Sequence, residues 1–462
     1  MAKNHTPNNK ILEEIVSVPA KALEIGVEAG EKLVKTLGNQ SPLKQAGKFW
    51  TALGPGLTTG AADDDPSGIA TYSQAGARYG FSLLWLSTFT FPLMAVVQEM
   101  CARIGLVTGQ GLAANIRKHF PPWVLYLCTG LLFFANTFNI GADLGAMATA
   151  AQLIIPKVGF NYLIIFFGAL SLFLQIFISY SDYAKYLKWL ALILIAYIFS
   201  ALSLDLNWNE ILKNTFLPQI KFSKDQIFLI CGILGTTISP YLFFWQTSQE
   251  VEEEILEGKT SILQRQRETS KGEIKKMRVD VWSGMFFSNL VMFFIIVTCA
   301  EILFKNGQFN IQTAADAASA LGPLAGQYAT LLFSIGIVGT GLLAVPVLAG
   351  STSYALSEAF GWKQGLYRKL KKASAFYGII IISVVLGMIM NFFHADPIKT
   401  LIYSAVINGL VAPIILILIV KISDSKTIMD KWANRPLTSA LGWIVSVVMI
   451  LAGVATLASF MF

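Results

Sequence analysis

The sequence has 462 residues, of which 54% are hydrophobic and 14% are charged, and its mean hydropathy is +0.59. Soluble globular proteins carry about 25% charged residues, so this composition excludes an ordinary soluble domain and predicts a surface that largely faces lipid. The formal net charge is +7. Because the basic residues gather at the ends of long apolar runs, they indicate membrane orientation and argue against nucleic-acid binding.

The amino-terminal segment, residues 1–47, is polar to amphipathic, and the first apolar run begins near Trp50. We therefore expect no cleavable signal. Residues 9–38 have a helix-prone amphipathic pattern, which predicts a cytoplasmic helix lying on the protein or on the membrane surface.

Cysteine and histidine residues offer no recognisable metal or catalytic site. The four cysteines fall in apolar runs without paired spacing, which argues against structural disulfides and against a cysteine metal site. The three histidines, His5, His119 and His394, lie at a terminus or in loops, so none is expected at mid-membrane depth.

Eleven segments are long and apolar enough to cross a bilayer, for which a helix needs about 20 such residues. They are residues 52–77, 81–107, 123–153, 160–180, 184–204, 225–248, 280–304, 325–357, 374–394, 399–421 and 438–461. With a cytoplasmic amino terminus, lysine and arginine in the inward-facing segments far outnumber those in the outward-facing ones. The pattern predicts an all-α protein of the cell membrane with eleven transmembrane helices and an outside carboxyl terminus.

The spans divide into two halves of five with one extra helix. Residues 48–206 hold spans 1–5, residues 207–424 hold spans 6–10, and residues 425–462 hold span 11. The segment 249–279 mixes acidic and basic residues and is expected to be a solvated cytoplasmic linker within the second half.

Two spans contain helix-breaking residues. Span 1 reads GLTTGAADDDPSGIATYSQAG around Pro66, and span 6 reads CGILGTTISPYLFFWQTS around Pro240. Proline removes a backbone donor and glycine tolerates irregular backbone, so each segment predicts an interruption. Two ordinary proline kinks are the simpler alternative. Broken helices at corresponding positions of two halves, however, are typical of a transport site at the membrane midplane.

Acidic residues accompany the first break. A carboxylate near the bilayer centre costs about 2.5–3.5 kcal/mol on insertion scales, and is a functional candidate by default. Asp65 directly precedes Pro66, so its carboxylate and the freed carbonyl groups are predicted to present oxygen ligands together. Asp143 in span 3 is a second intramembrane acid, whereas Asp63 and Asp64 are expected either to line an aqueous vestibule or to cap the outer half of span 1.

Other polar residues within the spans are expected to serve packing. Glu99 and Arg103 lie four residues apart on one helical face, which predicts that they pair with each other. Four asparagines are expected to form hydrogen bonds between helices. They are Asn136, Asn139, Asn391 and Asn408.

Motifs spread over residues 50–460 resemble the NRAMP family of divalent-metal transporters. They are LGPGL at 53–57, the DPSG break, QEMCARIGLVTGQGLAANIR at 98–117, ADLG at 142–145, GILGTTISPY at 232–241 and GLLAVPVLAGS at 341–351. The resemblance implies a LeuT-like 5+5 inverted repeat, with the metal ion held between the unwound parts of spans 1 and 6.

The departures from the family pattern are informative. Asp65, Pro66, Asp143 and Pro240 match the family motifs D-P-G-N, D-L-A-E and M-P-H. The replacements are Gly68 for the ligand asparagine, Ala146 for the second acid, Ser239 for methionine and Tyr241 for histidine. These replacements are similar to those of the subgroup called NRAMP-related magnesium transporters.

The resemblance and the remaining side chains together imply an oxygen-only metal site. Its candidate ligands are the Asp65 carboxylate, the Ala62 and Thr236 carbonyl groups and the Thr236 and Ser239 hydroxyls, while Gly68 leaves space. Loss of the methionine thioether removes any preference for soft metals. Magnesium retains several waters when bound, so a wider oxygen cage suits it, and manganese is also hard enough for such a site.

The missing histidine and acid also bear on the driving force. Without them we expect transport that is not obligatorily coupled to protons, because a divalent ion gains about 4.6 kcal/mol per 100 mV. Asp63, Asp64, Asp143 and Tyr241 remain candidates for the pathway or for proton relay, although Tyr241 is almost as well explained as a structural aromatic.

Three alternatives stay open. One is a proton-coupled manganese or iron importer with divergent ligands. Another is an organic-solute symporter of the LeuT fold, although three successive carboxylates would repel a substrate carboxylate. The third, an enzyme or receptor, is disfavoured because the sequence has no visible nucleophile–base pair, nucleotide loop or soluble catalytic domain. We expect no enzyme activity and no cofactor, with Mg²⁺ or Mn²⁺ as the transported substrate and the lipid bilayer as the surroundings; protein partners are not predicted.

Overall fold

The computed structural model describes residues 54–178, 195–220, 223–393 and 396–461, and the helices below belong to the unit Pro55–Phe462. The amphipathic segment predicted over 1–47 and most of predicted span 5, residues 184–204, lie outside the described residues. Short helix α10 (Ile195–Leu202) falls within the described end of that span.

Nine helices of the described residues are long and apolar enough to cross a membrane, which confirms the predicted all-α membrane fold. They comprise α5 (Trp85–Thr108), α7 (Pro122–Ile154), α8 (Phe160–Phe177), α12 with α13 (Lys224–Thr237 and Pro240–Leu256), α15 (Lys271–Cys299), α18 (Ala329–Phe360), α19 (Ser374–Met390), α20 (Pro397–Asp424) and α22 (Pro436–Ser459). Predicted span 1 is divided into α3 (Pro55–Asp63) and α4 (Pro66–Tyr79), each too short to be counted alone.

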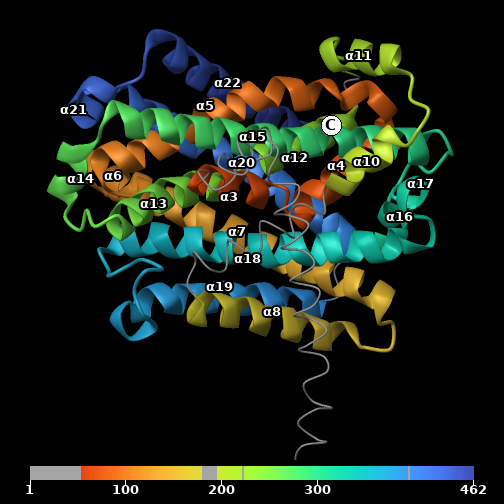
Figure 1. The fold of residues 1–462 in the computed structure, drawn as a ribbon, viewed down its shortest axis with the longest axis horizontal. Helices are drawn as coiled ribbons and strands as arrows, with labels where there is room; N and C mark the ends of the chain where they lie inside the picture. Colours follow the sequence, from red (N-terminus) through yellow and green to blue (C-terminus); the bar gives the residue numbers. More distant parts are fainter. Residues whose placement is uncertain (1–53, 179–194, 221–222, 394–395, 462) are drawn as a thin grey trace, which may run out of the picture. The chain divides into compact units, whose positions relative to one another are not determined.

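The divided helices occupy the centre of the bundle (Figure 1). Helices α7, α8, α18 and α19 pack together on one side, and α5 packs against α15 on the other. Between them, α3 and α4 contact α15, and α12 runs against α20. Both predicted breaks therefore lie in the interior, where irregular backbone is tolerated because protein surrounds it.

Glycines allow the central helices to approach closely. A Cβ atom on Gly60 of α3 would lie 2.3 Å from the carbonyl oxygen of Gly284 in α15, and one on Gly235 of α12 would lie 2.1 Å from the carbonyl oxygen of Ala405 in α20. Small residues let helix backbones touch in membranes, where van der Waals packing drives association. These contacts hold α3 against α15 and α12 against α20, next to the two breaks.

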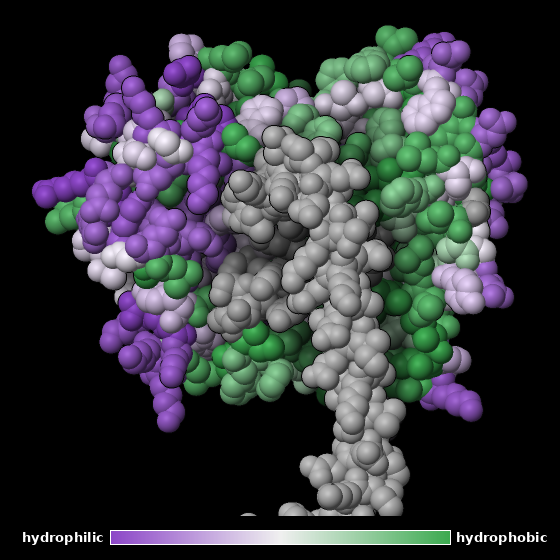
Figure 2. Space-filling model, viewed as in Figure 1, coloured by the Kyte–Doolittle hydropathy of each residue, from purple (hydrophilic) through white to green (hydrophobic). Residues whose placement is uncertain are grey.

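The surface polarity agrees with a membrane setting. Figure 2 shows hydrophilic residues gathered at two opposite ends of the visible face, with hydrophobic residues in the band between them. Large apolar side chains such as Phe134, Phe166 and Leu451 are 60%, 57% and 62% exposed. A soluble protein seldom exposes so much apolar surface, so lipid is the natural environment of this band.

The segment 249–279 differs from the solvated linker that we predicted. Helix α13 continues to Leu256, and α14 (Ile262–Glu268) follows before α15 begins at Lys271. A capping box between Ser270 and Glu273 starts α15 nine residues before the predicted span, because it satisfies free amide groups there. Several acids of the segment are buried, including Glu250 and Glu254.

Candidate functional site

The first break lies between α3, which ends at Asp63, and α4, which begins at Pro66. Proline fits the first position of α4 because it has no amide hydrogen to leave unpaired there. Asp65 is the N-cap of α4: its Oδ1 accepts hydrogen bonds from the Gly68 amide and from the Ser67 hydroxyl, both at 2.7 Å. Local sequence thus both interrupts span 1 and fixes the Asp65 carboxylate at the interruption.

The second break lies between α12, which ends at Thr237, and α13, which begins at Pro240. The Ser239 hydroxyl, predicted as a metal ligand, donates instead to the carbonyl oxygens of Gly235 at 2.6 Å and Thr236 at 2.8 Å. A hydroxyl at the end of a helix satisfies free carbonyl groups in this way, so Ser239 is turned back onto α12.

The two breaks meet. A Cβ atom on Gly68 would lie 3.1 Å from the Thr236 Oγ1 atom and 3.3 Å from the Asp63 carbonyl oxygen. On the outer turn of α4, the Tyr72 hydroxyl lies 3.2 Å from the Thr237 Oγ1 atom. Gly68 and Thr236, which we expected at one site, are therefore neighbours, and only a residue without a side chain fits between them comfortably.

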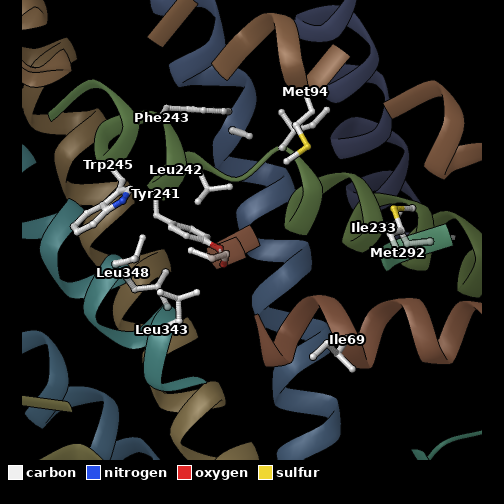
Figure 3. Packing of buried hydrophobic residues seen from close by; sticks show 14 of the residues in the cluster. Ile69, Met94, Ile233, Tyr241, Leu242, Phe243, Trp245, Met292, Leu343 and Leu348 are labelled. Carbon is white, nitrogen blue, oxygen red and sulfur yellow. The ribbon is translucent and has the colours of Figure 1, made fainter. Parts of the chain in front are cut away.

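Tyr241 of α13 joins the second break to the end of α3. Its hydroxyl donates to the Ala62 carbonyl oxygen at 2.9 Å, and the residue is 1% exposed. Figure 3 shows its ring among buried apolar side chains that include Leu242 and Leu348. The Ala62 carbonyl, predicted as a metal ligand, is thus already an acceptor, and the alternative of a structural aromatic describes Tyr241 better.

Asp63 and Asp64 neither line an open vestibule nor cap the outer helix. They are 0% and 3% exposed, and both contact Ser288 of α15. The Ser288 hydroxyl lies 2.5 Å from Asp63 Oδ2 and 3.3 Å from Asp64 Oδ1. Within the described residues, Asp63 Oδ1 has no hydrogen-bond partner. Ser288 was not anticipated, because nothing in the sequence of span 7 marks it.

Asp143 of α7 is fully buried, and neither of its carboxylate oxygens has a hydrogen-bond partner in the part of the chain that is described. It lies near enough to Asp65 for their charges to interact. Among the described residues, however, no three acidic, histidine or cysteine side chains converge as a metal cluster.

Asn139 reaches the site although we expected it only to pack helices. Its Nδ2 donates to Asp65 Oδ2 at 3.0 Å, and its Oδ1 accepts from the Ser404 hydroxyl of α20 at 2.8 Å. The available signal was its spacing: Asn139 precedes Asp143 by four residues, which places both on one face of α7. Asn136 behaves as predicted and bonds to α18 through Leu348, Ser351 and Thr352.

The predicted pairing of Glu99 with Arg103 is present at 3.8 Å, but it is not the closest contact of the carboxylate. Arg278 and the Trp282 indole of α15 both donate to Glu99 at 2.8 Å. Glu99 thus links α5 to α15, away from the two breaks.

Access to the site is limited in this structure. A cavity of ≈ 400 Å³ at the end predicted to face outside is lined by residues that include Arg78, Asp225 and Lys399. A second cavity of only ≈ 20 Å³ reaches Pro66 and shares the lining residues Ile311 and Ile398 with the first. The candidate ligands themselves are almost completely buried, so the site is closed behind an apolar constriction.

Two broken helices that meet in the middle of a bundle are typical of transporters with the LeuT fold, and structural comparison agrees. The fold matches the Eremococcus coleocola manganese transporter with a TM-score of 0.68 and 16% identity, covering 89% of this chain and 88% of that one. It also matches MhsT, solved in complex with L-phenylalanine, with a TM-score of 0.53 and 14% identity, covering 88% of this chain and 97% of that one.

The family model for natural resistance-associated macrophage protein-like proteins, Nramp, matches residues 56–459. The chain is therefore a multi-pass membrane protein that belongs to the Nramp family. It is 26% identical over 417 residues to the divalent metal cation transporter MntH of Caldanaerobacter subterraneus, covering 88% of this chain and 92% of that protein. It is also 26% identical over 407 residues to the MntH protein of Aeromonas hydrophila, covering 86% and 92%.

Proposed function

We propose that the chain transports hard divalent cations, Mg²⁺ foremost and Mn²⁺ second, by alternating access around the two breaks. The observation that carries the proposal is the close meeting of Asp65, Gly68 and Thr236, because it gathers a carboxylate, a hydroxyl and carbonyl oxygens. The printed names of the relatives, which are divalent metal and manganese transporters, support a divalent metal ion as the substrate.

The preference for magnesium rests on ligand chemistry. Position 239, at the second break, has a hydroxyl where a thioether would favour softer metals. The site offers one well-placed carboxylate, and magnesium is commonly held by one or two carboxylates while it keeps several waters. Manganese accepts the same oxygen donors, so it is the expected competitor.

Transport without obligatory proton coupling is the second part of the proposal. The break at 238–239 is followed by Tyr241, not by a titratable imidazole, and position 146 is alanine. A membrane potential of 100 mV supplies about 4.6 kcal/mol to a divalent ion, which is enough for more than a thousandfold accumulation at equilibrium. We place the protein in the cell membrane, with its amino terminus inside and its carboxyl terminus outside, where such a potential is present.

A proton-coupled manganese or iron importer is the alternative favoured by a specific observation. Within the described residues, both oxygens of Asp143 and one of Asp63 are buried without hydrogen-bond partners. Carboxylates in that condition are natural proton carriers in membrane proteins. An organic-solute symporter has less support, because Asp63, Asp64 and Asp65 would repel an anionic substrate.

The test is a flux measurement on purified protein in liposomes loaded with a pH-sensitive dye. An inside-negative potential should drive Mg²⁺ uptake, Mn²⁺ should compete, and internal pH should stay constant. Acidification in fixed proportion to metal uptake would establish the proton-coupled alternative. Absence of both Mg²⁺ and Mn²⁺ uptake at every potential would refute divalent transport itself.

A further inference from the structure

We propose that Asn139 is a specificity-determining ligand residue whose side-chain amide reverses as the ion arrives. In the structure its N–H faces Asp65, and on ion binding its Oδ1 turns to face the ion or one of the ion's waters. The proposal rests on the divalent-cation function proposed above and adds a residue, with its partner Ser404, to the site.

The amide is held between the first break and α20. Asn139 Nδ2 donates to Asp65 Oδ2 at 3.0 Å, and the Ser404 hydroxyl donates to Asn139 Oδ1 at 2.8 Å. Both Asn139 and Ser404 are 0% exposed. These two hydrogen bonds therefore form away from bulk water, where leaving a polar group unpaired is costly.

In this arrangement the Asp65 carboxylate accepts three hydrogen bonds. Its Oδ1 accepts from the Ser67 hydroxyl and the Gly68 amide, and its Oδ2 accepts from Asn139. A cation that approaches Oδ2 meets the positive end of the Asn139 N–H dipole. Because like polarities repel, turning the N–H away favours the approach of the ion or its hydration shell to Oδ2.

Ser404 makes that movement possible without the loss of a hydrogen bond. Its hydroxyl also lies 2.8 Å from the Leu401 carbonyl oxygen. A hydroxyl is one donor and two acceptor lone pairs, so it can turn its proton to Leu401 and accept from Asn139 Nδ2. The reversed amide then presents Oδ1 toward Asp65, and an amide oxygen is a suitable ligand for hard cations.

The neighbouring Asn136 provides a matched comparison. It lies one turn earlier in α7, is equally buried, and also donates hydrogen bonds from its side-chain amide to another helix. Its partners, Leu348, Ser351 and Thr352, all belong to α18, and none is a candidate ligand. Loss of Asn136 therefore reports the packing cost of removing a buried amide from α7.

The experiment compares wild type with N139A, S404A and N136A. For each protein, calorimetry gives the Kd for MgCl₂ and for MnCl₂, and thermal unfolding gives Tm with and without the ion. S404A should lower the ion-free Tm, because Asn139 Oδ1 loses its buried donor. It should also bind Mg²⁺ about tenfold more weakly, because the reversed amide leaves a buried N–H group without an acceptor, which is costlier than an oxygen without a donor. N139A should abolish the ion-induced rise in Tm. N136A should lower the ion-free Tm and leave the Kd unchanged.

Equal Mg²⁺ affinity of wild type, N139A and S404A would overturn the proposal. Identical losses of Mg²⁺ affinity in N139A and N136A would also overturn it. S404A retains Asn139, so it decides the question if N139A fails to fold. A wild-type protein that binds neither ion would overturn the proposed function and this inference together. Wild-type binding with unaffected variants would overturn the inference alone.

Discussion

At the scale of single residues, the two carboxylate oxygens of Asp65 have different hydrogen-bond partners and different roles. Oδ1 caps α4 through the Gly68 amide, whereas Oδ2 accepts a hydrogen bond from the Asn139 amide. A cap requires an oxygen acceptor, but a cation requires negative charge. The structure thus allows folding and ion binding to be tested independently at one position.

Asp65→Asn keeps an oxygen acceptor for the cap and removes the charge. We expect the Tm to remain close to that of wild type, because asparagine caps helices about as well as aspartate. Metal uptake should fall at least a hundredfold. Asp205→Asn, which removes an exposed carboxylate outside the site, is the charge-matched control and should leave uptake unchanged. Uptake by the Asp65 variant at the wild-type rate would contradict the assignment.

Gly68 determines the space beside Asp65. A Cβ atom there would approach Thr236 Oγ1 to 3.1 Å, so Gly68→Ala should crowd the site without unfolding α4. A partly hydrated Mg²⁺ needs more room than an ion that has lost waters, so the variant should lose Mg²⁺ uptake more than Mn²⁺ uptake. Parallel flux assays of the two ions give the ratio of Mg²⁺ uptake to Mn²⁺ uptake. Gly130→Ala, where no atom lies within 4 Å of the new Cβ, is the control and should preserve it.

At the scale of elements, the breaks are held together by a few polar contacts across the gaps. Tyr241 on α13 reaches Ala62 at the end of α3, and Tyr72 on α4 reaches Thr237 at the end of α12. Each contact uses a backbone or hydroxyl group that the interruption leaves available. Helix α13 is therefore linked to α3, and α4 is linked to α12.

Tyr241→Phe removes one of these ties and leaves the ring packing intact. The Ala62 carbonyl loses its donor, so the free energy of unfolding should fall by about 1 kcal/mol, which chemical unfolding in detergent can measure. Mg²⁺ affinity should change little, because the hydroxyl is a structural donor. A large loss of Mg²⁺ affinity with unchanged stability would instead indicate that Tyr241 lines the ion pathway.

The close contact between α3 and α15 gives a second prediction at this scale. Gly60→Val would place its Cβ atom 2.3 Å from the Gly284 carbonyl oxygen, a distance that backbone atoms cannot relieve locally. We expect little monodisperse protein in size-exclusion chromatography. Gly378→Val, on α19 with no atom within 4 Å of the new Cβ, should elute like wild type. Normal elution of the Gly60 variant would contradict the packing of α3.

The elements also show what sequence could predict. Both breaks were predicted because proline and glycine interrupt a helix through local geometry, and the observed gaps lie beside Pro66 and Pro240. The separate roles of Asn136 and Asn139 could be predicted only in part, since both are asparagines in one apolar helix and only the four-residue spacing of Asn139 from Asp143 distinguishes them. Their roles depend on which helices face each turn of α7, and that is decided by tertiary packing.

At the scale of the whole molecule, the structure is closed around the candidate site. Ile311 and Ile398 line both the outer cavity and the small cavity that reaches Pro66. Alternating access requires this constriction to open while the opposite side remains sealed. We propose that the ion binds at the meeting point of the breaks and not in the larger outer cavity.

Anomalous X-ray diffraction from crystals soaked in Mn²⁺ tests this position directly, because the metal's anomalous signal marks where it is bound. We expect a peak within about 2.0–2.6 Å of an Asp65 carboxylate oxygen, or one water further away, between Gly68 and Thr236. A peak confined to the outer cavity near Asp225 and Asp396, with none beside Asp65, would contradict it.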